Sequence, residues 1–215
     1  MTKSKQTTMD NGVPHVMVFD LETTGLPKKW NVHPFQTANY DTCRVINIGY
    51  VLLDKHNTIL KKVDHLIKHE KRVDVTNSEI HGITNQEIEE SGIPLNTALK
   101  EFMGDIYTCK KLVAHNIDFD FNVLLSELYR KYESCRRIIG QMYTKELVCT
   151  MKIGKRFMKV TKFPKLVELY KHIHDIYWEQ THRALDDAVV CAACYVHMQV
   201  FNSTLGTLQP DFTEN

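Results

Sequence analysis

A short apolar run, His15-Val-Met-Val-Phe-Asp20-Leu21, leads directly into Glu22-Thr-Thr-Gly25-Leu-Pro27. The run predicts a buried strand, and the Thr, Gly and Pro residues after it predict a turn. Because side chains alternate along a strand, Asp20 and Glu22 lie on one face of the predicted sheet. Two clustered carboxylates suit a divalent cation that offsets their repulsion, although two ordinary acids at a solvated strand end would give the same pattern.

Apolar periodicity predicts the elements that follow this strand. Residues 44–53 and 58–67 are two β-rich runs joined by the polar residues 54–57, which predicts a hairpin. Beyond it, apolar spacing predicts helices over residues 95–106, 119–132, 166–173 and 184–200, with strands over 111–114 and 146–150. Because the hairpin is antiparallel and the crossovers are parallel, we expect an α/β fold with a mixed, five-stranded sheet flanked by helices.

The length of 215 residues fits one domain. We expect that domain to cover residues 14–200, between flexible tails at 1–13 and 201–215 that lack apolar periodicity. Inside the domain, residues 27–43 form a long aperiodic insertion that could shape a substrate groove.

The composition indicates which partners and which cellular compartment to expect. The chain has 27 Lys and Arg against 26 Asp and Glu, so its formal charge of +1 gives no overall attraction to polyanions, and contact with nucleic acid must come from a local site. The six cysteines lack the spacing of secreted domains and no apolar leader precedes the first strand. We therefore expect free thiols in a soluble, intracellular protein, cytoplasmic or nuclear and not secreted. No apolar stretch reaches the roughly 18 residues of a membrane span.

One cysteine pair, Cys191-Ala-Ala-Cys194, has the form of a redox or zinc pair. It lies inside an apolar helical run and has no second pair at finger spacing, so we expect buried packing instead.

Two further polar motifs lie where predicted helices begin. The first, His115-Asn-Ile-Asp118-Phe-Asp120, falls at the sheet edge where open α/β folds bind ligands, although its acids equally suit helix capping. The second is Thr181-His182-Arg183-Ala-Leu-Asp186-Asp187. In one continuous helix His182 would align with Asp186, and Arg183 with Asp187 as a surface pair, so His182 can meet Asp187 only from a preceding loop. The acids and the histidine come from three elements of one sheet, where they can converge.

In this order the three motifs resemble those of the DEDDh (DnaQ-like) 3′-to-5′ exonucleases of the RNase H-like superfamily, over about residues 14 to 200. Phe19 to Leu26 resembles the first motif, His115 to Asp120 the second and His182 to Asp187 the third. Arg44-Val-Ile-Asn-Ile-Gly49 and His81-Gly-Ile-Thr84 resemble the family's second strand and a substrate-contacting turn. The family often has a short connection after its first motif, whereas residues 27–43 intervene here, which leaves the substrate range open.

The resemblance implies that four carboxylates hold two Mg²⁺ or Mn²⁺ ions. Asp20 would bridge both ions, Glu22 and Asp187 would complete the ion that activates water, and Asp120 would help to hold the second. The family pattern selects Asp120 over Asp118 and Asp187 over Asp186, and it makes neutral His182 the general base.

The resemblance also implies substrate contacts around a 3′-terminal nucleotide, from Thr23, Thr24, Gly25, Leu26, His81, Thr84, Asn116 and Phe119. Leu26 and Phe119 equally suit the core, and His81 equally suits a turn whose backbone it satisfies.

The function implied by the resemblance is metal-dependent release of nucleoside 5′-monophosphates from the 3′ end of DNA or RNA. The expected partner is nucleic acid with a free 3′ end, preferably single-stranded; a polymerase or a repair or replication complex is a further candidate, and a membrane is not. Two other hypotheses stay open. One is a catalytically silent module that binds nucleic acid or protein, and the other is a phosphoesterase acting on short oligonucleotides.

Overall fold

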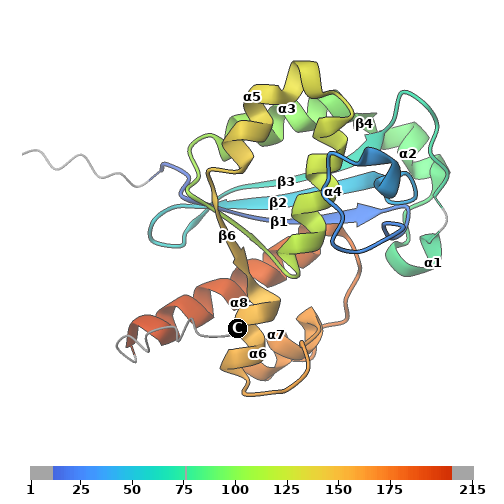
Figure 1. Cartoon of the computed structure of the whole chain (residues 1–215). Helices are drawn as coiled ribbons and strands as arrows, with labels where there is room; N and C mark the ends of the chain where they lie inside the picture. The colour runs from blue at the N-terminus through green and yellow to red at the C-terminus, as the bar shows by residue number, and fades with distance from the viewer. Residues whose placement is uncertain (1–11, 76, 205–215) are drawn as a thin grey trace, which may run out of the picture.

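The computed structural model describes residues 12–75 and 77–204. Its centre is one mixed sheet with the strand order β4-β3-β2-β1-β5-β6 (Figure 1). The strands are β1 Val16–Thr23, β2 Val45–Leu53, β3 Ile59–Lys68, β4 Ile93–Pro94, β5 Lys111–Ala114 and β6 Glu146–Cys149. β1, β2 and β3 pair antiparallel, whereas β5 joins β1, and β6 joins β5, in parallel. The predicted mixed α/β sheet is confirmed, with six strands instead of five.

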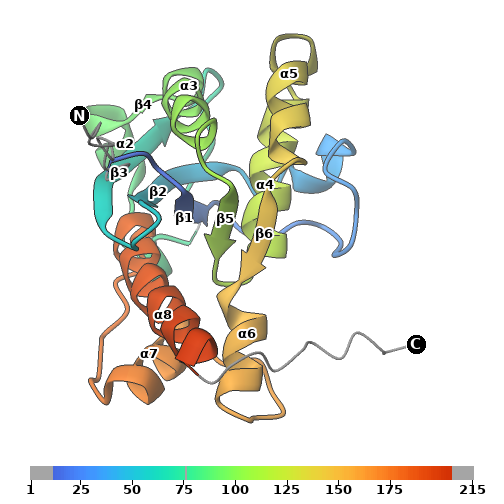
Figure 2. The same ribbon diagram turned by 90° about the vertical axis from the view of Figure 1, so that its left-hand side faces the viewer.

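Helices cover both faces of this sheet (Figures 1 and 2). On one face lie α3 Leu95–Ile106, α4 Ile117–Tyr129 and α5 Tyr132–Met142, and on the other lie α6 Thr150–Phe157, α7 Leu166–His174 and α8 Ala184–Thr204. Two short helices, α1 Ser78–His81 and α2 Asn85–Ser91, connect β3 to β4. The predicted helix over 119–132 ends at Tyr129 and is followed by the separate α5. α8 continues to Thr204, and residues 1–11 and 205–215 of the predicted tails lie outside the described residues.

The alternation along β1 decides which layer each side chain joins. Met17, Phe19 and Leu21 pack into the core under α3 and α4, whereas Val16 and Val18 pack into the core under α8. Asp20 and Glu22 continue the Val16 and Val18 side, so both carboxylates point toward the layer that contains α8.

α8 lies unusually close to the backbone of β2. A Cβ placed on Gly49 would come within 2.0 Å of the Leu185 nitrogen, so only glycine allows the first turn of α8 to approach the strand here. The fully buried Asn47 fixes the same contact, because its Oδ1 accepts a hydrogen bond of 3.0 Å from the Ala184 N–H. The contacts with β2 therefore fix the position of the first turn of α8.

The insertion at 27–43 folds back against α4 (Figures 1 and 2) and contains one 3₁₀ turn, Thr37–Tyr40. Inside it, the Tyr40 hydroxyl donates to the Val32 carbonyl at 2.6 Å, and the Asn39 side chain bonds both the N–H and the carbonyl of Lys29 at 2.9 Å. The insertion is thus held by its own hydrogen bonds.

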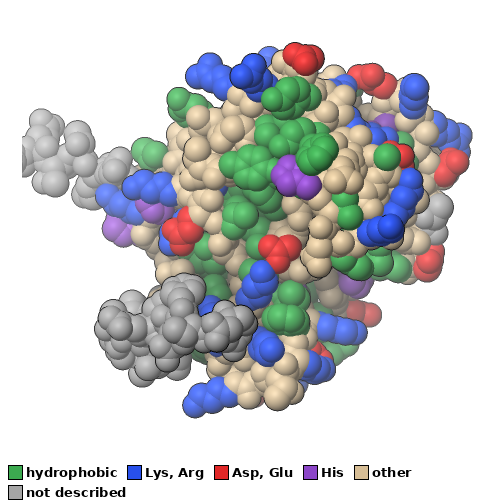
Figure 3. All heavy atoms as spheres, in the orientation of Figure 1, with side chains coloured by type: hydrophobic (Ala, Val, Ile, Leu, Met, Phe, Trp, Pro, Cys, Tyr) green, Lys and Arg blue, Asp and Glu red, His purple; other side chains and the backbone are tan. Residues whose placement is uncertain are grey.

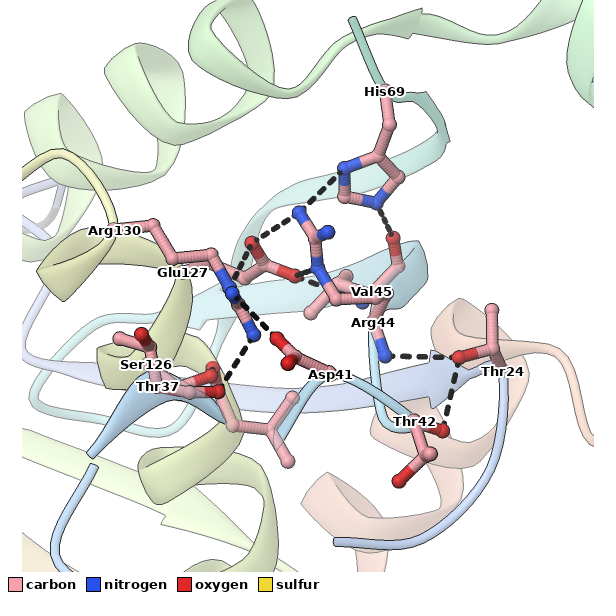
Figure 4. A network of polar contacts seen from close by, with 11 residues as sticks. Thr24, Thr37, Asp41, Thr42, Arg44, Val45, His69, Ser126, Glu127 and Arg130 are labelled. Atoms are coloured by element: carbon pink, nitrogen blue, oxygen red, sulfur yellow. Dashed lines mark hydrogen bonds and ion pairs between the residues drawn. The ribbon is translucent and has the colours of Figure 1, made fainter. Parts of the chain in front are cut away.

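An ion-pair network around the buried Glu127 ties this insertion to α4 and β2 (Figure 4). Arg130, the C-cap of α4, donates to the Thr37 carbonyl and to Asp41, each at 2.9 Å. Glu127, almost fully buried, accepts two bonds from Arg44, at 2.7 and 2.9 Å. Because a buried carboxylate is stable only when such partners are present, the network fixes the insertion in one position.

All six cysteines are free and buried, which confirms the expected thiols and the packing role of Cys191 and Cys194. Among residues 12–75 and 77–204, no helix combines the length and the hydropathy that crossing a bilayer would require.

Candidate active site

Carboxylates from three elements meet at the end of β1. Glu22 of β1 and Asp187 of α8 each offer an oxygen, and His182 a ring nitrogen, and these ligand atoms all lie within 4.8 Å of one another. Asp120 of α4 joins from the other side, where its Oδ1 accepts a hydrogen bond of 3.2 Å from the Leu21 N–H, between Asp20 and Glu22. Asp20 has Glu22, Asp120 and Asp187 as charged neighbours, so the structure brings together all five residues that the family resemblance implies as catalytic.

The two acids of the second motif have different positions. Asp120 is only 3% exposed and faces β1, whereas Asp118 is exposed and pairs with Lys152 at 2.6 Å. Both stand in the first turn of α4, where helical geometry points them to different sides. Asp120 is therefore the acid of this motif that belongs to the cluster.

His182 reaches the cluster from a loop. It precedes α8 with a φ of 50°, in the left-handed region that a residue with a side chain rarely adopts. This turn lets its ring approach Asp187 although the two are five positions apart. Arg183, the expected surface partner of Asp187, instead pairs with Glu87 of α2 at 2.9 Å.

The charges of the acids act on one another. Burial raises the pKa of Glu22 from 4.5 to about 8, with further contributions from Asp187 and Asp120. Burial also raises the pKa of Asp187 from 3.8 to about 6, against the hydrogen bond from Gln180. The pKa values of Asp20 and Asp120 lie well above their ordinary range for the same reason, and nearby carboxylates raise that of Asp20 further. The cluster as a whole resists full ionisation unless positive charge is supplied.

The donor set fits divalent cations. Asp187 is 4% exposed, and its Oδ1 is buried without a hydrogen-bond partner among the described residues. Carboxylate oxygens are the ligands that Mg²⁺ and Mn²⁺ prefer, and an unpartnered buried oxygen beside other carboxylates is the arrangement a cation would complete. The residues that could hold such ions are Glu22, Asp187, Asp20 and Asp120.

We expect the melting temperature in EDTA to fall as the pH rises from about 4.5 to about 8. Folding raises the pKa of Glu22 to about 8 and that of Asp187 to about 6, so the folded state keeps protons that the unfolded chain has released. Stability from these groups is complete below their ordinary pKa values and is lost as the pH passes the raised ones.

Thermal unfolding across this pH range, in EDTA and in saturating Mn²⁺, measures the effect. Mn²⁺ and the Glu22→Gln variant should each flatten the decline. If the melting temperature declines with pH equally steeply in wild type and in Glu22→Gln, the prediction is contradicted.

Four positioning residues are not among the predicted site residues: Gln180, Asn47, Arg183 and Glu87. Gln180 donates a short hydrogen bond to Asp187 Oδ2, and Asn47 holds the first turn of α8. The Arg183 and Glu87 pair ties the loop before α8 to α2, and the charge of Arg183 lowers the pKa of Glu22. The contacts of Asn47 with Ala184 and of Arg183 with Glu87 join segments far apart in the chain, and no local pattern signals them.

The predicted substrate residues divide into a group that is partly or largely exposed and a group that is engaged within the protein. Leu26 is 61% exposed, so it is not a core residue; Asn116 is half-buried in a left-handed turn, and Phe119 is half-buried. The others are engaged within the protein. The Thr24 hydroxyl bonds the Thr42 carbonyl at 3.1 Å, a Cβ on Gly25 would lie 2.9 Å from that carbonyl, and the Thr23 hydroxyl bonds the Gly25 carbonyl at 2.7 Å.

His81 and Thr84 belong to this second group as well. His81 is buried, and its Nδ1 accepts from the Ile83 N–H at 3.1 Å, as the turn interpretation predicts. Thr84 caps α2 by accepting from the Glu87 N–H at 3.1 Å. Burial and the charges of Arg183 and His182 lower the pKa of His81, which places that ring beside the loop before α8.

Solved structures share this fold. Exonuclease X in complex with 5′-overhanging duplex DNA is 20% identical, with a TM-score of 0.58 over 89% of this chain and 94% of that chain. E. coli Exonuclease I in complex with a dT13 oligonucleotide is 14% identical, with a TM-score of 0.65 over 88% of this chain and 42% of that chain. S. pombe Pop2p in its Mg²⁺- and Mn²⁺-bound form is 17% identical, with a TM-score of 0.64 over 91% of this chain and 86% of that chain.

At these identities the likeness is one of fold, and this chain spans less than half of the length of Exonuclease I. A search of the curated proteins gives no match. The family model RNase T, described as exonuclease, matches residues 17–195, and this match confirms the resemblance to the DEDDh-type exonucleases of the RNase H-like superfamily. The chain therefore belongs to this family of nucleic-acid exonucleases.

Proposed function

We propose that this protein is a 3′-to-5′ exonuclease that releases nucleoside 5′-monophosphates by two-metal hydrolysis. Asp20, Glu22, Asp120 and Asp187 would hold two Mg²⁺ or Mn²⁺ ions, and His182 would be the general base. The observation that carries the proposal is the approach of ligand atoms of Glu22, His182 and Asp187 to within 4.8 Å of one another, where Asp187 Oδ1 is buried and has no hydrogen-bond partner in the part of the chain that the structure describes. A silent binding module would have no need of such repelling acids.

The chemistry follows from the properties of these side chains. When bound, two divalent ions supply a nucleophile at neutral pH and neutralise charge at the phosphate. Burial, with a contribution from Lys165, lowers the pKa of His182 below its ordinary value, so the imidazole is neutral at pH 7 and can accept the proton of the attacking water. Gln180 holds Asp187 in place beside it. The exposed Leu26 and the half-buried Phe119 would contact the terminal nucleotide, with His81, Thr84 and the Thr23 to Gly25 turn supporting them.

Digestion of matched 3′- and 5′-labelled single-stranded DNA and RNA, with Mg²⁺ or with EDTA, tests the proposal. We expect metal-dependent release of mononucleotides from the 3′ end. Cleavage of dinucleotides alone would favour the phosphoesterase hypothesis, and binding without cleavage would favour the silent module.

Replacing His182 by Ala should lower turnover about 100- to 10,000-fold, the usual contribution of a positioned acid or base. The acid limb of the pH–rate profile, expected below pH 6.5 in the wild type, should disappear with it. Kinetics with saturating Mg²⁺ over pH 5 to 9 measure both effects.

The same variant distinguishes a base from a metal ligand, since His182 lies close enough to Glu22 and Asp187 to be either. If His182 is a base, calorimetry should show that the His182→Ala variant binds Mn²⁺ as wild type does. Loss of one bound ion would instead make His182 a ligand.

A further inference from the structure

An exposed aromatic surface begins beside the acid cluster and follows α4 away from it. We call it the aromatic strip, and its members come from the insertion and from the α4–α5 hairpin: Trp30, His33, Phe35, Phe119, Tyr129 and Tyr143. Figure 3 shows hydrophobic side chains gathered around a histidine on the face where Figure 1 places α4 and α5. Trp30 is 58% and Phe35 59% exposed, which is high for such large apolar side chains.

The rings of the strip form two packed groups, one near the start and one at the end of α4. The Trp30 and Phe119 centroids lie 6.2 Å apart with the rings tilted by 50°. His33 lies 5.0 Å from Phe35 and 6.0 Å from Tyr129, and its Nε2 is 3.4 Å from the Tyr143 hydroxyl. The insertion thus supplies three of the rings, and two of these pack against Phe119 and Tyr129 of α4.

The position of the strip connects it to the cleavage site. Phe119 directly precedes Asp120, and Tyr129 stands at the last position of the same helix. Ten residues of helix rise about 15 Å. This is the length of about four stacked nucleotides at 3.4 Å each.

We propose that the aromatic strip stacks the bases of the single strand that leads, in the 5′ direction, away from the terminal nucleotide. This inference rests on the proposed function and names the surface that holds its substrate. Aromatic rings offer a stacking face to every base, and such platforms bind single strands without reading their sequence. Lys28 and Lys29 directly precede Trp30, and Lys28 also pairs with Asp41 at 3.8 Å. The two lysines would supply positive charge near the phosphates in a chain whose formal charge is only +1.

The strip is prepared for binding before the substrate arrives. The hydrogen bonds of Arg130 to Thr37 and Asp41 fix the insertion on α4, so its rings lose little freedom when bases stack on them.

Fluorescence of Trp30 tests the contact directly. The chain has two tryptophans, so in a Trp178→Phe background Trp30 is the sole reporter. We expect oligothymidylates of five or more nucleotides, titrated in EDTA to prevent cleavage, to quench Trp30 saturably, and dithymidylate to do so at least tenfold more weakly. Equal response to dimer and decamer, or no response, would overturn the proposal.

Kinetics give the second arm. Trp30→Ala and Phe35→Ala should each raise KM for a decathymidylate about tenfold, as loss of one base stack implies, with a smaller change for the dimer. Tyr107→Ala is the matched control, because Tyr107 is 60% exposed but follows α3, outside the strip. An equal effect of Tyr107→Ala would overturn the proposal.

The two arms separate this inference from the proposed function. Length-dependent quenching without any cleavage would support the strip while rejecting the nuclease. Normal cleavage with neither quenching nor a KM change would reject base stacking on the strip but not the nuclease. It would favour a protein as the partner of the aromatic strip.

Discussion

Replacing Asp20 by Asn should lower nuclease turnover at least about a thousandfold while leaving the fold intact. Asp20 lies beside Glu22, Asp120 and Asp187, and the proposed mechanism makes it a ligand of both ions. Each bound ion contributes several kcal/mol of charge stabilisation, and about 1.4 kcal/mol corresponds to a factor of ten in rate. Because burial and the neighbouring carboxylates disfavour a charge on Asp20, the neutral Asn should leave the melting temperature in EDTA level or raise it.

The measurement is digestion of a 3′-labelled oligonucleotide with saturating Mg²⁺, alongside thermal unfolding in EDTA. Asp118→Asn is the matched control, since Asp118 is an acid of the same helical turn that faces Lys152 at the surface. It should keep wild-type turnover. Full activity in Asp20→Asn, or an equal loss in both variants, would remove Asp20 from the mechanism.

Replacing Gly49 by Ala should lower the free energy of unfolding by about 3 kcal/mol or more, which corresponds to roughly 6 to 12 °C in melting temperature for a chain of this size. The added Cβ would lie 2.0 Å from the Leu185 nitrogen and 2.1 Å from the Ala184 carbonyl carbon. Both are backbone atoms, so the strand or the helix must move. Because α8 carries Asp187, the folded fraction should also lose activity.

Urea unfolding and turnover per folded molecule measure these effects. Gly104→Ala serves as the control, because Gly104 lies in α3 with open space around its Cα. That variant should be neutral or more stable by about 0.4 to 1 kcal/mol, through the entropy of the unfolded chain. If both variants unfold at the same urea concentration, α8 does not depend on Gly49.

The strands β1, β2 and β5 could be predicted because they are buried runs bounded by turns. β5 was predicted with its exact limits, and β1 and β2 to within two residues. α5 was missed because it buries only Cys135, Ile139 and Met142 and presents polar residues elsewhere, so its apolar pattern is sparse. β4 has two residues, too few for any periodicity.

The acids of the site followed from their motifs, but the choice between neighbours did not follow from helical geometry alone. Asp118 and Asp120 share one turn, and only the packing of α4 against β1 makes one a surface residue and the other a cluster residue. The roles of Asn47 and Gly49 were equally hidden, because their partner Ala184 is more than a hundred positions away along the chain. Long-range contacts of this kind are fixed by tertiary packing, not by local sequence.

The left-handed backbone at His182 has a consequence for evolution. A residue with a Cβ in this region costs on the order of 1 to 3 kcal/mol relative to glycine, and glycine would relieve that cost. Glycine has no imidazole, so selection for stability and selection for activity oppose each other at this position. The protein carries the less stable choice, and a search for stabilising substitutions would first select the residue that the proposed mechanism needs as its general base.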